Sequence, residues 1–191
     1  MVLACADAPA APEEHLTVRG AELTVGPDLV LRAEEATLSP SGAGQGTAAS
    51  AVATEANAPP LEVTADRTQW DLHASEARFE GNVVALRGPV TLRCARLDVG
   101  FEKGSQPRIV RAVAAGAVEV VRGDQLATAE RAELETGTGR LVLTGSPTLR
   151  DGPHHMAGGQ IVLWLDEDRA ECDACRVTVV GSVGEDATGA P

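Results

Sequence analysis

The feature that most restricts how this chain can fold is a glycine between two stretches in which apolar and polar residues alternate. We call such a glycine, where the chain turns, a corner. Within residues 77–88, apolar side chains such as Phe79 alternate with charged ones before Gly81, and the alternation resumes at Val83. A period of two residues is typical of a strand with one buried face. Gly81 and Asn82 both tolerate a positive φ angle, so the backbone can turn sharply between the two stretches. The sequence therefore predicts a strand, a corner and a second strand.

This corner recurs along the chain. Gly116 and Gly145 stand between similar alternating stretches, so the corner glycines are 35 (116 − 81) and 29 (145 − 116) residues apart. A second motif, built on small residues, lies between the corners. It reads Ala-x-x-Ala-x-Leu at residues 33–38 and 129–134, with variants at 94–97 and 158–161. Repeats at such spacings indicate stacked supersecondary units that share one core.

The motifs follow one another in a recognisable order. They are Ala-Asp at residues 65–66, an aromatic residue at Trp70, Phe-x-Gly-Asn-Val at residues 79–83 and Leu-Thr-Gly-Ser-Pro at residues 143–147. This order resembles the OstA-like family of lipopolysaccharide-transport proteins. The resemblance covers residues 61–180 well and residues 15–38 weakly.

The arrangement of the candidate strands predicts an all-β protein. Alternating stretches with frequent turns between residues 61 and 180 favour a sandwich, a barrel or a roll. The resemblance implies a β-jellyroll, a V-shaped roll of two sheets made of many short antiparallel strands. We expect a flexible leader at residues 1–14, the jellyroll at residues 15–180 and a disordered tail at residues 181–191. Residues 39–60 are rich in Ala, Gly, Ser and Thr without a period, which favours a low-complexity loop inside the roll.

Composition and motifs argue against several classes of function. The net charge is −12 at pH 7, and binding of nucleic acid requires a basic surface, so no nucleic-acid partner is expected. No apolar run approaches the roughly 18 residues that a membrane helix needs. The sequence lacks Gly-x-Ser-x-Gly, phosphate-loop and His-Glu-x-x-His motifs, and His154-His155 is typical of a solvated turn. We therefore expect no enzyme, no catalytic residue, no cofactor and no metal site.

The cysteines leave more than one interpretation open. Cys172 and Cys175 form a Cys-x-x-Cys motif, which can be a disulfide, a pair of free thiols, or a metal or redox site. A periplasmic location favours a disulfide among Cys94, Cys172 and Cys175. Residues 2–5 end at Cys5 and look like the lipid-modification site of a bacterial lipoprotein, although only Met1 precedes them.

The resemblance implies a carrier of lipid in the periplasm. OstA-like proteins form jellyrolls that hold the acyl chains of lipopolysaccharide in an apolar groove and stack through edge strands with other jellyrolls of the transport complex. The same stacking would give a homo-oligomer. The candidate groove residues are Phe79, Val83, Leu92, Leu141, Leu143 and Ile161. The alternatives are a membrane-anchored adaptor attached through Cys5, a structural β-roll that binds no lipid, and a metal or redox protein that uses its cysteines.

Overall fold

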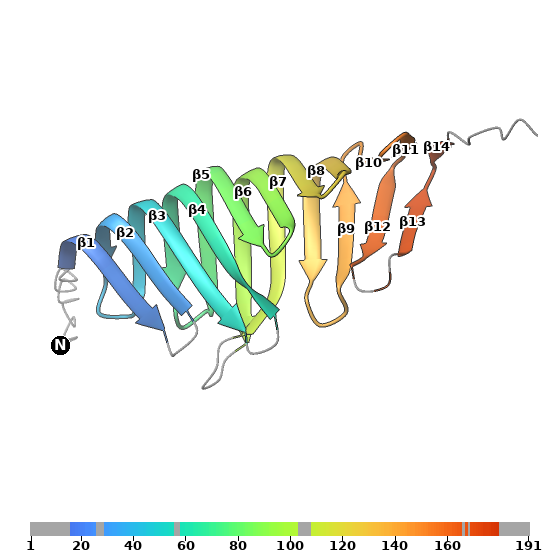
Figure 1. Cartoon of the computed structure of the whole chain (residues 1–191). Helices are drawn as coiled ribbons and strands as arrows, with labels where there is room; N and C mark the ends of the chain where they lie inside the picture. The colour runs from blue at the N-terminus through green and yellow to red at the C-terminus, as the bar shows by residue number, and fades with distance from the viewer. Residues whose placement is uncertain are drawn as a thin grey trace, which may run out of the picture.

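The computed structural model describes residues 16–25, 29–55, 58–102, 108–165, 167 and 169–179. Within these residues the chain has no helix and forms 14 antiparallel strands joined in one open sheet (Figure 1). The strands are β1 (Leu16–Val25), β2 (Leu29–Leu38), β3 (Ala43–Glu55), β4 (Ala58–Asp71), β5 (Glu76–Arg87), β6 (Val90–Glu102), β7 (Arg108–Arg122), β8 (Gln125–Glu135), β9 (Arg140–Thr144), β10 (Thr148–Asp151), β11 (His154–Ala157), β12 (Gln160–Trp164), β13 (Arg169–Asp173) and β14 (Arg176–Thr178). The predicted all-β fold is confirmed.

Most strands are long and bent, so that one strand belongs to two layers. Figure 1 shows β1 to β8 running through one layer, curving over along one side of the molecule and returning in the other. From β9 onward, each bent strand is divided into two short strands, one in each layer. β9 pairs with residues 131–135 of β8 and β10 pairs with residues 125–128, so β9 and β10 together form one bent strand. β11 with β12 and β13 with β14 repeat this arrangement. The described chain thus contains 11 (8 + 3) bent strands.

The pairing register defines the two layers. The first layer consists of residues 16–19, 35–38, 43–47, 67–71, 76–80, 96–102, 108–115, 131–135, 140–144, 160–164 and 169–173. The second layer consists of residues 21–25, 29–33, 49–53, 58–65, 83–87, 90–94, 118–122, 125–129, 148–151, 154–157 and 176–178. At both edges of the described sheet, β1 and the pair β13–β14 run from the first layer to the second.

The corners lie where the glycine motif predicts them. Gly81 and Asn82 have φ angles of 77° and 45°, and the ladder between β5 and β6 shifts register at this point. Gly116 and Gly145 also have positive φ angles, each followed by another residue with positive φ. A Cβ atom on Gly81 would lie 2.4 Å from Oδ2 of Asp66, so glycine is required there for space as well as for φ. The two short strands predicted on either side of Gly81 are one bent strand, β5.

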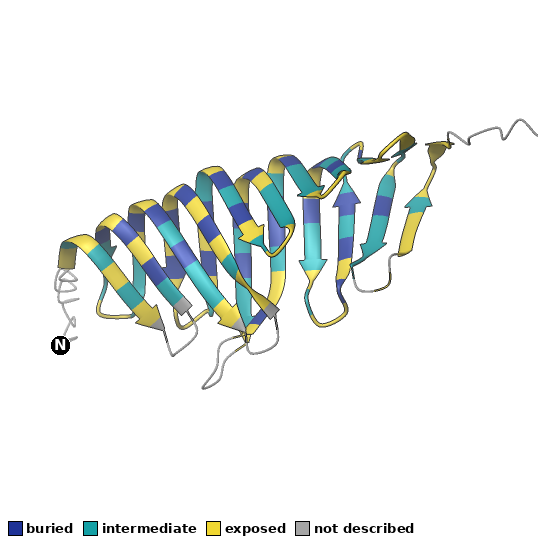
Figure 2. Cartoon of the chain, viewed as in Figure 1, coloured by how far each residue is buried: buried dark blue, intermediate teal, exposed yellow. Residues whose placement is uncertain are grey.

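Small aliphatic side chains fill the space between the layers. Figure 2 shows buried and exposed residues alternating along the strands, as expected when each strand has one inward face. One inward row crosses the first layer through Phe79, Leu97, Ala114, Ala132, Leu143 and Ile161. A matching row crosses the second layer through Leu31, Ala51, Val63, Ala85, Leu92 and Val120. The two rows face each other and form the core.

The segment expected to be a low-complexity loop is largely a strand. Residues 43–55 form β3, which pairs with β2 and β4 along its length. Its inward face carries Gly44 and Gly46 in the first layer and Ala49 and Ala51 in the second. These small residues give no visible apolar period, although they alternate correctly. A Cβ atom on Gly44 would lie 2.4 Å from the ring of Trp70, so the glycine makes room for that side chain.

Candidate functional site

A mainly apolar cavity lies between the two layers, toward the strand ends that are far from the corners. Its volume is about 490 Å³, and residues from β4 to β9 line it. The inward side chains that shape it include Leu61, Leu92, Val99, Ala112, Leu134 and Leu141. We call this cavity the groove. Its lining is built by strand alternation alone, because every second residue of the paired strands must face the interior.

Two arginines stand at the rim of the groove. Arg87 ends β5 in the second layer, Arg108 begins β7 in the first layer, and both line the cavity. They come from opposite layers, so each layer contributes one guanidinium group to the rim.

The structure divides the six predicted groove residues into two groups. Leu92 and Leu141 line the groove. The other four lie closer to the corners and are packed in the core, with exposed fractions of 2% for Phe79, 1% for Val83 and 0% for Leu143 and Ile161. All six face inward, as the alternation predicts. Contact of any of them with lipid stays a prediction.

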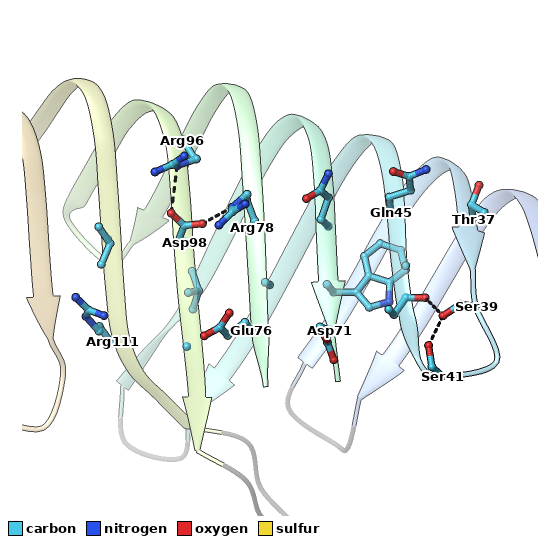
Figure 3. Close-up of a pocket in the computed structure, with 18 of the residues that line it drawn as sticks. Thr37, Ser39, Ser41, Gln45, Asp71, Glu76, Arg78, Arg96, Asp98 and Arg111 are labelled. Atoms are coloured by element: carbon cyan, nitrogen blue, oxygen red, sulfur yellow. Dashed lines mark hydrogen bonds and ion pairs between the residues drawn. The ribbon is translucent and has the colours of Figure 1, made fainter. Parts of the chain in front are cut away.

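A larger, polar cleft of about 810 Å³ lies on the outer face of the first layer (Figure 3). Nε of Arg78 donates to Oδ1 of Asp98 at 2.5 Å, and Arg96 reaches Oδ2 of the same carboxylate at 3.2 Å. The hydrogen bond to Asp98 raises the pKa of Arg78. Glu133 holds Arg111 and Arg131 in the same manner. Each carboxylate thus forms ion pairs with two guanidinium groups. These pairs lie on a solvated face, where ion pairs contribute little stability.

The cysteines separate into a disulfide and a buried thiol. Cys172 and Cys175 form a disulfide across the corner between β13 and β14, which is one of the interpretations that the sequence leaves open for this motif. A Cβ atom on Gly158 would lie 2.6 Å from Sγ of Cys175, so the disulfide packs closely on the neighbouring corner. Cys94 is a free, buried cysteine, and burial raises its pKa to about 11, which keeps the thiol protonated at neutral pH. Cys5 lies outside the described residues, so its lipid modification stays a prediction.

Two further observations concern metal ions and membranes. Among the described residues, no group of three or more His, Cys, Asp and Glu side chains is arranged to hold a metal ion. His154 and His155 are neighbours on β11, so their side chains point to opposite faces. The part of the chain that the structure describes also has no helix long and apolar enough to cross a bilayer.

Comparison with known proteins identifies the family. A family model described as "LptA/(LptD N-terminal domain) LPS transport protein" matches residues 62–169, which is 108 (169 − 62 + 1) of the 191 residues. The chain belongs to this family of lipopolysaccharide-transport proteins. The resemblance carried by the glycine corners is therefore confirmed.

Members of this family and its structural neighbours support the fold. The structure of LptH from Pseudomonas aeruginosa, the LptA-homologous periplasmic component of a conserved lipopolysaccharide transport device, matches with a TM-score of 0.59 and 14% sequence identity. The match covers 64% of this chain and 96% of LptH, and it confirms the jellyroll-like architecture. An uncharacterised protein of Rhizobium meliloti (strain 1021) is 27% identical over 126 residues, which are 62% of this chain and 68% of that protein.

Proposed function

We propose that this protein is a periplasmic carrier that holds the acyl chains of lipopolysaccharide in the groove between its layers. The observation that carries the proposal is the cavity of about 490 Å³, which is lined by aliphatic side chains of both layers. Acyl chains are recognised through buried apolar area, which stabilises a complex by about 25 cal/mol per Å². In this proposal no bond is made or broken, so the protein is not an enzyme.

The rim of the groove supports the same ligand. Arg87 and Arg108 border the apolar interior, where the polar head of a bound lipid would emerge. Arginine suits the phosphate groups of such a head, because its planar guanidinium donates two parallel hydrogen bonds to an oxyanion. The groove therefore combines an apolar interior with a cationic border.

Photo-crosslinking to lipopolysaccharide tests the proposal. A photoreactive side chain at Leu92 or at Leu141 should crosslink, because both positions line the groove. The matched controls are Arg93 and Val142, the next residues along the same strands, whose side chains point to the outer faces. Equal yields at lining and control positions, or none in folded protein, would refute the proposal and leave a structural β-roll.

We also propose that copies of this chain, or related jellyrolls of the transport complex, associate through the edge strands. The inward rows end in exposed apolar side chains, because Leu16 on β1 is 62% exposed and Val177 on β14 is 53% exposed. A docked strand would cover these side chains and pair the free backbone groups of the edge.

An exposed charge at the edge tests this association. Val177→Asp should leave the fold intact, since the residue is exposed, but it should weaken association because docking would bury a charge. Thr178→Asp is the matched control, because this neighbouring residue faces outward on the same strand. Sedimentation velocity measures the outcome, and identical behaviour of the two variants would contradict edge docking.

A further inference from the structure

The bend between β13 and β14, at residues 174–175, differs from the glycine corners, and we call it the last bend. The corners at Gly81, Gly116 and Gly145 each place a glycine in the left-handed region, and Gly20 does so on the opposite edge strand. The last bend has no glycine, and Ala174 has a φ angle of 51° there. Alanine is unfavourable in this region because its Cβ comes close to the following carbonyl oxygen. Another feature must therefore hold the last bend.

Neighbouring strands hold the last bend on one side only. Ala48 has a similar φ angle of 45° in β3, but β2 and β4 pair with that strand on both sides. The pair β13–β14 lies at the edge of the described sheet, and three residue pairs join β14 to β11. All three residues of β14 are exposed. The disulfide spans Ala174, so it is the covalent tie that keeps this edge strand bent.

The disulfide lies where an external thiol can reach it. Cys175 is exposed, whereas Cys172 is half-buried and packs against the core. Exposed disulfides are the ones that exchange readily with thiols, while structural ones resist reduction. The loop that the bond closes is short, since the two cysteines are three residues apart, so the bond adds comparatively little to the stability of the whole fold. The bond can therefore open without unfolding the protein.

We propose that this disulfide is a redox switch that controls docking of another jellyroll at the β13–β14 edge. The inference rests on the proposed association through edge strands. With the bond closed, both layers present a paired strand at this edge. With the bond open, Ala174 leaves the left-handed region and β14 separates from β11, while five residue pairs keep β13 on β12. The second-layer half of the docking edge, with its exposed Val177, is then lost.

The reductant that opens the switch is a dithiol. One of its thiolates attacks Sγ of Cys175, the exposed sulfur, and Sγ of Cys172 leaves as a thiolate. The second thiolate of the reductant then attacks the reductant's own sulfur in the mixed disulfide and releases Cys175. Two electrons have passed to the protein, the reductant has become a disulfide, and the two cysteines take up the two protons that the dithiol has lost. An external disulfide closes the bond by the same steps in reverse.

Sedimentation velocity of the full chain tests the switch. The protein reduced with dithiothreitol should associate about tenfold more weakly than the oxidised protein, because docking loses one or two hydrogen bonds. A variant that combines Cys172→Ser with Cys175→Ser should match the reduced protein and should not respond to dithiothreitol. It retains Cys5 and Cys94, so a response that persists in this variant would assign the effect to another thiol and overturn the switch. Equal association of the oxidised and reduced proteins would overturn it as well.

A glycine in the last bend separates the switch from general damage to the edge strand. Ala174→Gly, added to the double serine variant, supplies a residue that accepts a positive φ angle without a disulfide, as Gly81 does in its corner. This triple variant should recover association both with and without dithiothreitol. If it associates no better than the double serine variant, the bend is not what the disulfide controls, and the proposal is wrong.

Amide hydrogen exchange distinguishes a failed switch from failed docking. On reduction, residues 176–178 should lose protection while residues 169–173 keep theirs, because the two strands have different neighbours. If this selective loss occurs but the oxidised protein does not associate, the proposed docking fails, and control of docking fails with it. Equal protection of residues 176–178 in both redox states would refute the opening of the bend itself.

Discussion

Leu143 and Leu92 both face inward, but only Leu92 lines the groove, so truncating each to alanine separates the core from the binding surface. Leu143 is 0% exposed and lies between Ala132 and Ile161 of the neighbouring strands. Shortening a fully buried leucine to alanine costs about 3–5 kcal/mol, because apolar area is lost and a cavity remains. In a protein of this size each kcal/mol lowers the Tm by about 2–4 °C, so Leu143→Ala should lower it by about 6–20 °C.

Leu92→Ala should have a small effect on stability and a clear effect on lipid binding. Leu92 is half-buried against an existing cavity, so its truncation should destabilise the fold by only about 1 kcal/mol. Loss of a similar amount of apolar contact with an acyl chain should weaken lipopolysaccharide binding about fivefold. Thermal melts and binding titrations on both variants provide the measurement. Equal losses of Tm, or weaker binding by folded Leu143→Ala but not by Leu92→Ala, would refute the division into core and groove.

Three other predictions concern the corners and the surface. Reducing the disulfide between β13 and β14 should destabilise the protein by about 2 kcal/mol, since the loop it closes is short, and melts with and without a reductant measure this. The hydrogen bond from Arg111 lowers the pKa of Glu133, so the pair contributes stability above the unfolded pKa of about 4.3 and loses it as the pH falls through the lower folded value. Arg111→Ala should therefore lower the Tm slightly at neutral pH and not at all in strong acid, and a pH-independent effect would contradict the assignment. Gly81→Ala should lower the free energy of unfolding, measured in urea, more than Gly20→Ala does. Both glycines have a positive φ angle, but only a Cβ at position 81 would meet a neighbouring carboxylate. Equal losses of stability would be inconsistent with the packed corner.

The corners and the inward faces could be predicted from the sequence because both are local properties. A glycine followed by a residue that tolerates positive φ marks the turn, and alternation marks the buried face. The pattern fails at β3, where Gly44 and Gly46 occupy inward positions that bulky residues occupy elsewhere. A Cβ on Gly44 would meet Trp70 of β4, and a Cβ on Gly46 would meet Ala33 of β2. No local pattern can reveal these contacts between strands.

The local sequence also does not show whether an inward residue is packed in the core or lines the groove. Leu141 and Leu143 are two residues apart on β9 and face the same way, yet only Leu141 lines the cavity. Ala132, which pairs with Leu143 in the same inward row, also lines the cavity, so neither the inward direction nor the row decides which residue reaches it. Val99 and Ala112, which pair with each other in one inward row, also line the groove, and no local pattern marks them.

The odd number of bent strands has a consequence for any filament built from this chain. β1 and the pair β13–β14 both run from the first layer to the second. If β14 and β13 of one copy pair with β1 of the next copy and each layer continues into the same layer, the two edge strands must therefore be parallel. The strand pairs inside the molecule are all antiparallel. Antiparallel joints would instead unite like ends and reverse the orientation of each successive copy. Parallel pairs are slightly weaker per residue than antiparallel ones, so a filament with polarity would come apart at its joints before its subunits unfold. Only such a filament has two different termini.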